Sequence, residues 1–260
     1  MKKTLVLLFF LLAMVSFAQE TSPEGQVYDN TQFWTSVNGT LRFSQRWGLI
    51  TDAHIRRDDF LRQPSFYFLR LGGAYWINDQ FSVAGGLAAL WAAIDTDVGT
   101  EFALEKRIYQ QLLWRAAMKK VVFLQRIRIE QRWHEVLDLA DGTVDRIRFS
   151  NRFRFLFSAS FQVFNNPKAP RATISDEVLF HVGKEIVYNT FDQNRLFLGF
   201  NQSLGKNWSV DYGYMMVYQQ RYSGFEYDLN HTIRLFFYFT PDLRKDKDEE
   251  LPHYPVGGIE

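Results

Sequence analysis

An array of arginines is the part of this sequence best suited to binding chemistry. Arginines recur at alternate positions of two neighbouring segments, interrupted by Glu130 and Ser150, and carboxylates within and beyond these segments could face them. A ring of arginines around a narrow passage attracts anions and selects them over cations. The array and its candidate partners are Arg126, Arg128, Glu130, Arg132, Arg146, Arg148, Arg152, Arg154, Glu177 and Asp211, with Asp52 as a further candidate.

A second kind of chemistry would need a histidine beside a serine. His134 and Ser150 lie on the polar faces of the same two segments, so a lipid or acyl hydrolase with a His-activated serine is one hypothesis. No nucleophile elbow surrounds Ser150, and none of the five histidines has the spacing of a metal site. An ordinary polar pair is therefore favoured, and we expect no catalysis, no metal and no cofactor.

Alternation of apolar and polar residues indicates which elements hold these side chains. Over residues 146–163 the odd positions are apolar except Asn151, and the even positions are polar except Leu156. A helix would place Phe153 and Phe155 about 200° apart, so this period of two predicts a strand. Comparable alternation covers residues 32–43, 47–56, 66–77, 81–91, 108–118, 121–134, 173–182, 195–204, 208–220 and 227–239.

The number and length of these segments predict a transmembrane barrel. Most reach the 9–11 residues or so that a tilted strand needs to cross a bilayer. Short turns alternate with longer polar connections, of which 92–107 is an example. Bacterial barrels have an even number of strands, so the eleven segments lead us to expect twelve strands, with ten as the alternative. Residues 24–30 would contribute to the missing strand, or the N-terminal segment would thread the lumen.

The beginning and end of the chain have their own patterns. Lys2 and Lys3, an apolar run and a small-residue site at residues 16–18 predict a cleaved secretory signal over 1–18. We expect an N-terminal periplasmic or lumen segment at 19–30, the barrel at 31–240 and a polar, disordered tail at 241–260. The net charge of +1 does not suggest a nucleic-acid partner.

Alternation alone also fits a soluble periplasmic β-protein that binds a small ligand. No lysine lies inside an assigned strand, whereas many arginines lie on the polar faces. A confined lumen favours arginine, whose planar fork pairs with carboxylates through two hydrogen bonds. The aromatic content of 17% suits lipid-facing strands with interfacial girdles. The antiparallel up-and-down transmembrane β-barrel, an all-β fold, is therefore the favoured class.

The order of several short motifs resembles the family called domain of unknown function 2490. The motifs are Gln32-Phe33-Trp34-Thr35, Arg56-Arg57, the run from Arg126 to Arg132, Arg146-Ile147-Arg148-Phe149 with Arg152, and the run from Asn194 to Gly199. The resemblance implies an outer-membrane β-barrel of Gram-negative bacteria with no established activity and no catalytic residues. Phe239 would be the aromatic that ends the last strand, but here residues 240–260 follow it.

These observations predict an outer-membrane protein without enzymatic activity. The barrel would be a narrow anion-preferring pore, or a structural barrel whose arginines form a salt-bridged lumen. The second is favoured because ten to twelve strands leave little free lumen. Outer-membrane lipid is the expected partner. The sequence indicates no soluble partner, substrate or oligomeric state.

Overall fold

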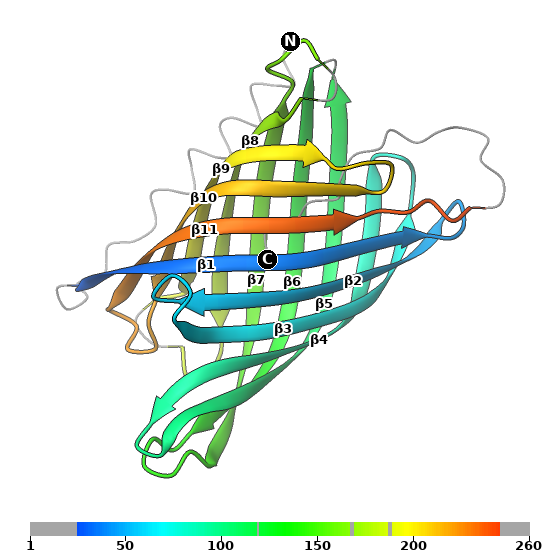
Figure 1. The fold of residues 1–260 in the computed structure, drawn as a ribbon. Coiled ribbons are helices and arrows are strands. Elements are labelled where there is room, and N and C mark those ends of the chain that lie inside the picture. Colours follow the sequence, from blue (N-terminus) through cyan, green and yellow to red (C-terminus); the bar gives the residue numbers. More distant parts are fainter. Residues whose placement is uncertain (1–24, 119, 167–168, 187–188, 245–260) are drawn as a thin grey trace.

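The computed structural model describes residues 25–118, 120–166, 169–186 and 189–244, which form one closed, all-β barrel (Figure 1). Consecutive strands pair antiparallel around the barrel. This part of the chain contains no helix long and apolar enough to cross a membrane. The strands are β1 (Val27–Arg42), β2 (Trp47–Asp58), β3 (Gln63–Trp76), β4 (Phe81–Thr96), β5 (Gly99–Met118), β6 (Val121–Leu137), β7 (Val144–Phe161), β8 (Arg171–Val182), β9 (Phe191–Ser203), β10 (Trp208–Gln220) and β11 (Tyr227–Phe239).

The barrel closes through a parallel pair of strands. Figure 1 shows β1 and β11 side by side with their arrowheads pointing the same way, and their register runs from Val27–Tyr227 to Gly39–Phe239. The expectation of twelve or ten strands is wrong, because the described residues form eleven. An odd number of up-and-down strands leaves the first and last strands running in the same direction, and parallel pairing satisfies their backbone groups. Residues 27–30 extend β1 and form no separate strand.

The strands continue further than the sequence pattern suggested. The expected connection 92–107 lies almost entirely within β4 and β5, which are joined only by Asp97 and Val98. Lys106, which the sequence pattern placed in this connection, is an exposed residue of β5. We attribute the error to polarity, since Lys106 on the outward face and its charged neighbours Glu105 and Arg107 gave the segment the composition of a loop. Inward and outward positions still alternate there, and β4 and β5 stay paired from Phe81–Trp114 to Thr96–Gly99.

The two ends of the barrel are named here by their connections. Among the described residues, the vestibule end carries 59–62, 97–98, 138–143, 183–186, 189–190 and 221–226, and the turn end carries 43–46, 77–80, 120, 162–166, 169–170 and 204–207. At the turn end, part of the expected disordered tail is ordered. Arg244 donates to Gln45 Oε1 (2.7 Å), and Leu243 N donates to Arg42 O (2.8 Å), so residues 241–244 pack on the first turn. The expected signal at 1–18 and the tail after 244 lie outside the described residues.

The barrel has the reverse polarity of a soluble domain. Arginines and glutamates are buried inside, whereas large aliphatic residues of the strands face outward and are exposed, such as Leu71 (56%) and Leu87 (64%). The polar side chains on this outer face bond across strands. Asn194 Nδ2 donates to Asp176 Oδ1 at 2.7 Å, and Gln110 bonds Gln131 at 3.1 Å. Such pairing lowers the free-energy cost of a polar group on an apolar surface.

Close backbone approach between β3 and β4 depends on two glycines. Gly72 and Gly86 face each other across these strands, and the Tyr109 hydroxyl fills the space where a Cβ of Gly72 would lie. A Cβ at Gly86 would overlap the carbonyl oxygen of Leu71 and the Cα of Gly72. These neighbours are backbone atoms, which cannot rotate away.

Gly86→Ala should therefore lower the free energy of unfolding by about 1–3 kcal/mol, the usual range for overpacking. Gly73→Ala is the matched control, because a Cβ there meets nothing within 4 Å. Urea unfolding in lipid vesicles, followed by tryptophan fluorescence, measures both variants. Equal stability of the two variants would contradict this account of the β3–β4 contact.

Candidate functional site

Glu177 is the centre of a buried ion-pair network inside the barrel. It comes from β8, is fully buried, and accepts from arginines on β6, β7 and β9. Arg126 Nη2 lies 2.7 Å from its Oε1, and Arg154 donates to both carboxylate oxygens at 3.0 and 2.9 Å. Arg195 Nη1 is 3.4 Å from Oε2. One carboxylate thus neutralises part of the charge of three guanidiniums.

Glu130 is a second carboxylate of the same network. Arg152 Nε donates to its Oε2 at 2.7 Å, and Arg154 Nη1 donates to its Oε1 at 3.0 Å. Arg154 therefore bridges Glu130 and Glu177. Arg128 bonds the neutral amide oxygen of Gln111 at 2.8 and 3.1 Å and lies 3.8 Å from Glu130.

Glu105 anchors the network toward the vestibule end. Arg132 makes two parallel hydrogen bonds to its carboxylate, at 2.7 and 2.8 Å, and Arg107 Nε lies 2.5 Å from Oε1. Asp192 on β9 lies 3.4 Å from Arg152 and 4.0 Å from Arg132. The two Asp192 contacts join β9 to β7 and β6, which are not its neighbours, so they help to fix the cross-section of the barrel.

Four of the residues singled out in the sequence lie outside this network. Asp52 is buried and pairs with Arg70 of β3. Arg146 is half exposed and pairs with Asp145 and Glu185 near the loops of the vestibule end. Arg148 stacks on the ring of Tyr222, with its guanidinium carbon 4.1 Å from the ring centre. Asp211 is buried nearer the turn end, where it accepts from Asn201, Arg234 and Tyr238.

Sequence reasoning missed several members of the network. Glu105 and Arg107 were assigned to a loop, although they occupy alternate inward positions of β5. The same period-two pattern, extended back from residue 108, would have placed both on the polar face. The residues that join the network without having been singled out are Glu105, Arg107, Gln111, Asp192 and Arg195.

The network carries more positive than negative charge. Its guanidiniums belong to Arg107, Arg126, Arg128, Arg132, Arg152, Arg154 and Arg195, and its carboxylates to Glu105, Glu130, Glu177 and Asp192. Among these described residues seven arginines face four carboxylates. Neutral amides accept some of the hydrogen bonds of these arginines. Gln111 accepts from Arg128, and Gln193 accepts from Arg195. The centre of the lumen is therefore electropositive.

An apolar cluster fills the lumen beside the network, largely toward the turn end. Phe197 and Phe236 are fully buried, and Arg234 stacks on both rings at 4.2 and 4.3 Å. The cluster takes side chains from seven strands, so apolar groups from opposite walls meet inside the barrel. Its members are Trp34, Leu113, Leu124, Leu156, Phe197, Met215, Val217, Phe236 and Tyr238.

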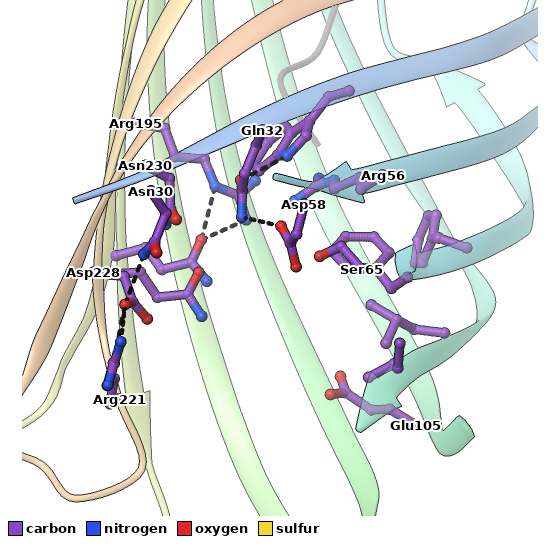
Figure 2. A pocket seen from close by; sticks show the side chains of 18 of the residues that line it. Asn30, Gln32, Arg56, Asp58, Ser65, Glu105, Arg195, Arg221, Asp228 and Asn230 are labelled. Carbon is purple, nitrogen blue, oxygen red and sulfur yellow. Dashed lines mark hydrogen bonds and ion pairs between the residues drawn. The ribbon is translucent and has the colours of Figure 1, made fainter. Parts of the chain in front are cut away.

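On the other side of the network the lumen opens into a vestibule. This cavity measures about 780 Å³, and its floor includes Arg107, Arg152 and Arg195. Figure 2 shows its polar rim, where Gln32 Nε2 donates to Asp58 at 2.8 Å and Asn30 Nδ2 donates to Asp228 at 3.0 Å. The cavity volume falls within the range of about 300–1,000 Å³ typical of small-molecule sites.

Tyr222 projects from the connection 221–226 into this space and also lines a second chamber next to the vestibule. Its hydroxyl lies 3.1 Å from His134 Nε2, and His134 Nδ1 lies 3.3 Å from Glu105. A tyrosine hydroxyl is protonated at neutral pH, so that of Tyr222 can donate to the imidazole.

The geometry gives no support to the serine hydrolase hypothesis. Ser150 pairs in register with Arg132, and His134 pairs with Arg148. No hydrogen bond joins His134 to Ser150 in the described part of the chain, because His134 instead bonds Tyr222. Within the same residues, no group of three or more His, Asp or Glu side chains could hold a metal ion.

Comparisons with known proteins support the family resemblance. The family model described as "Protein of unknown function (DUF2490)" matches residues 31–231. The search of curated proteins finds no match. A solved structure described as the NanC porin in a rhombohedral crystal form is 13% identical, with a TM-score of 0.42 over 72% of this chain and 83% of that chain.

Proposed function

The chain belongs to the DUF2490 family of proteins of unknown function, and we propose that it is an outer-membrane β-barrel whose lumen is closed to solutes. In this proposal the barrel presents a vestibule at one end and does not conduct ions. The observation that carries it is the distribution of polarity, with apolar side chains exposed outside and a filled, charged lumen inside.

The outer surface supports a membrane location. Exposed aliphatic side chains occur on strands around the whole barrel, including Leu71, Ile127, Ile174, Leu198 and Ile233, each at least 42% exposed. A closed barrel satisfies all of its backbone groups within the sheet, which a chain in hydrocarbon requires. The secretory signal expected over 1–18 would deliver the chain across an inner membrane, so the outer membrane is the location that we propose.

The filled cross-section supports a closed lumen rather than a pore. A conducting pore needs a continuous polar passage, whereas here the apolar cluster occupies the lumen between the vestibule and the turn end. The arginines that could form an anion filter are held by carboxylates and amides instead, as Arg154 is by Glu130 and Glu177. They therefore act as packing that locks the walls together.

We expect the refolded protein to give no conductance steps in a planar bilayer. Insertion is checked on the same preparation by heat-modifiable migration, since a folded barrel should run faster on a gel before boiling than after. Stable anion-preferring conductance that falls in Arg152→Gln would overturn the closed lumen and make the barrel a pore. Lack of any heat-dependent shift and recovery in the soluble fraction would favour the soluble periplasmic alternative.

A further inference from the structure

We propose that the vestibule is a binding site for a small amphipathic anion, a molecule with one negatively charged head and a compact apolar body. The inference concerns ligand recognition and does not depend on whether the barrel conducts. It combines three features of the same cavity: an electropositive floor, an uncharged wall and a volume suited to a small molecule.

The floor supplies the site for the anionic head. Arg195 lines the cavity, and its shortest hydrogen bonds, at 2.6 and 2.9 Å, go to the neutral amide oxygen of Gln193. Its contact with the Glu177 carboxylate is longer, at 3.4 Å. A guanidinium whose main acceptor is neutral retains the capacity to bind an anion, and the excess of arginine in the network reinforces this attraction.

The wall formed by β3 and β4 supplies the site for the apolar body. The inward positions of β4 carry no charge, in contrast to those of β6, β7 and β8. Phe66 and Phe68 of β3 border this surface, and the guanidiniums of Arg56 and Arg107 lie over their rings, at 4.2 and 5.3 Å. Trp34 is buried beside it, below Arg56 and Arg195. The inward residues of β4 are Ser82, Ala84, Gly86, Ala88, Leu90, Ala92 and Ile94.

Small side chains on β4 also explain why the cavity exists. Alanine at position 92 pairs in register with Phe66 and lines the vestibule, so the space in front of it is empty. A fully charged ligand would leave this wall unused. A fully apolar ligand would leave Arg195, whose shortest hydrogen bonds go to the neutral amide of Gln193, without an added anion. A ligand with both parts satisfies both surfaces at once.

The rim admits such a ligand while holding the mouth of the cavity in place. Arg221 donates twice to Asp228, at 2.6 and 2.9 Å, and Asp58 accepts from Gln32 (Figure 2). These bonds connect β11 to its preceding loop, and β1 to β2. The polar groups of the rim are mostly paired with one another. The deeper guanidiniums are therefore the groups that would donate hydrogen bonds to the anionic head of the ligand.

Calorimetric titration of the barrel in lipid nanodiscs with octanoate tests the proposal, with empty nanodiscs as the blank. We expect saturable binding near one octanoate per barrel, at least tenfold weaker binding of octan-1-ol, which lacks the charge, and at least tenfold weaker binding of acetate, which lacks the chain. Equal binding of octan-1-ol would refute the role of the arginines. Equal binding of acetate would refute the apolar wall, and absence of saturable binding would overturn the site.

Two alanine substitutions on one strand locate the binding. Ala92→Phe fills the cavity, and it should weaken octanoate binding by at least tenfold. Ala89→Phe is the matched control, since residue 89 faces outward on the same strand and does not line the cavity, and it should leave binding unchanged. Equal effects of the two variants would place the binding outside the vestibule. Arg195→Gln should weaken octanoate binding while leaving the weak binding of octan-1-ol unchanged.

Discussion

Replacing Glu177 with glutamine should lower the free energy of unfolding by about 3–5 kcal/mol, the usual loss when one partner of a buried ion pair is removed. The carboxylate is fully buried and interacts with Arg126, Arg154 and Arg195. Glutamine has nearly the same shape, so the loss reflects charge rather than packing. The guanidiniums would remain buried without that counter-charge, and the network already has an excess of arginine.

Urea unfolding of the refolded barrel in lipid vesicles measures this effect. Glu185→Gln is the control, because Glu185 also pairs with an arginine, Arg146, but both side chains are well exposed to solvent. Exposed pairs contribute little, so this variant should unfold at the same urea concentration as the unmodified protein. A Glu177→Gln variant as stable as the Glu185→Gln variant would show that the network does not hold the barrel together.

Replacing Leu87 with lysine should lower the free energy of unfolding in vesicles by about 2–4 kcal/mol, the cost of a lysine at the midplane of the lipid-facing surface. Leu87 lies near the middle of β4, faces outward and is 64% exposed. Its neighbour on β3 is Leu71, which is also exposed, so the lysine would stand in an apolar surface. Reduced yield of the heat-modifiable form should accompany the loss.

Leu139→Lys provides a matched comparison for the membrane location. Leu139 lies in the connection 138–143 and is 59% exposed, nearly the same as Leu87. In a soluble barrel both lysines would reach water and both variants would be as stable as the unmodified protein. In a membrane only the Leu87 variant should lose stability, so equal behaviour of the two would contradict the proposed location.

Part of this architecture could be predicted because it is local. A strand alternates its side chains between two faces whatever lies across from it, so the inward direction of Arg126, Arg128, Arg152 and Arg154 follows from period two alone. The eleven alternating segments correspond to the strands of the described residues for the same reason. Glu105 and Arg107 were nevertheless assigned to a loop, because Lys106 between them interrupts the apolar face although the period of two continues.

The sequence by itself therefore determined which segments form strands, which side chains of each strand point inward, and that arginines line the lumen. Only the tertiary structure decided how the barrel closes. Bacterial barrels usually have an even number of strands, whereas this one closes with an odd number because β1 and β11 pair in parallel. The ion-pair partners inside the lumen could not be predicted from the sequence either. Glu177 and Arg126 are far apart in sequence, and they come into contact only because the sheet curves into a barrel. The vestibule arises in the same way, since an uncharged strand and an arginine-rich wall become one cavity only through closure.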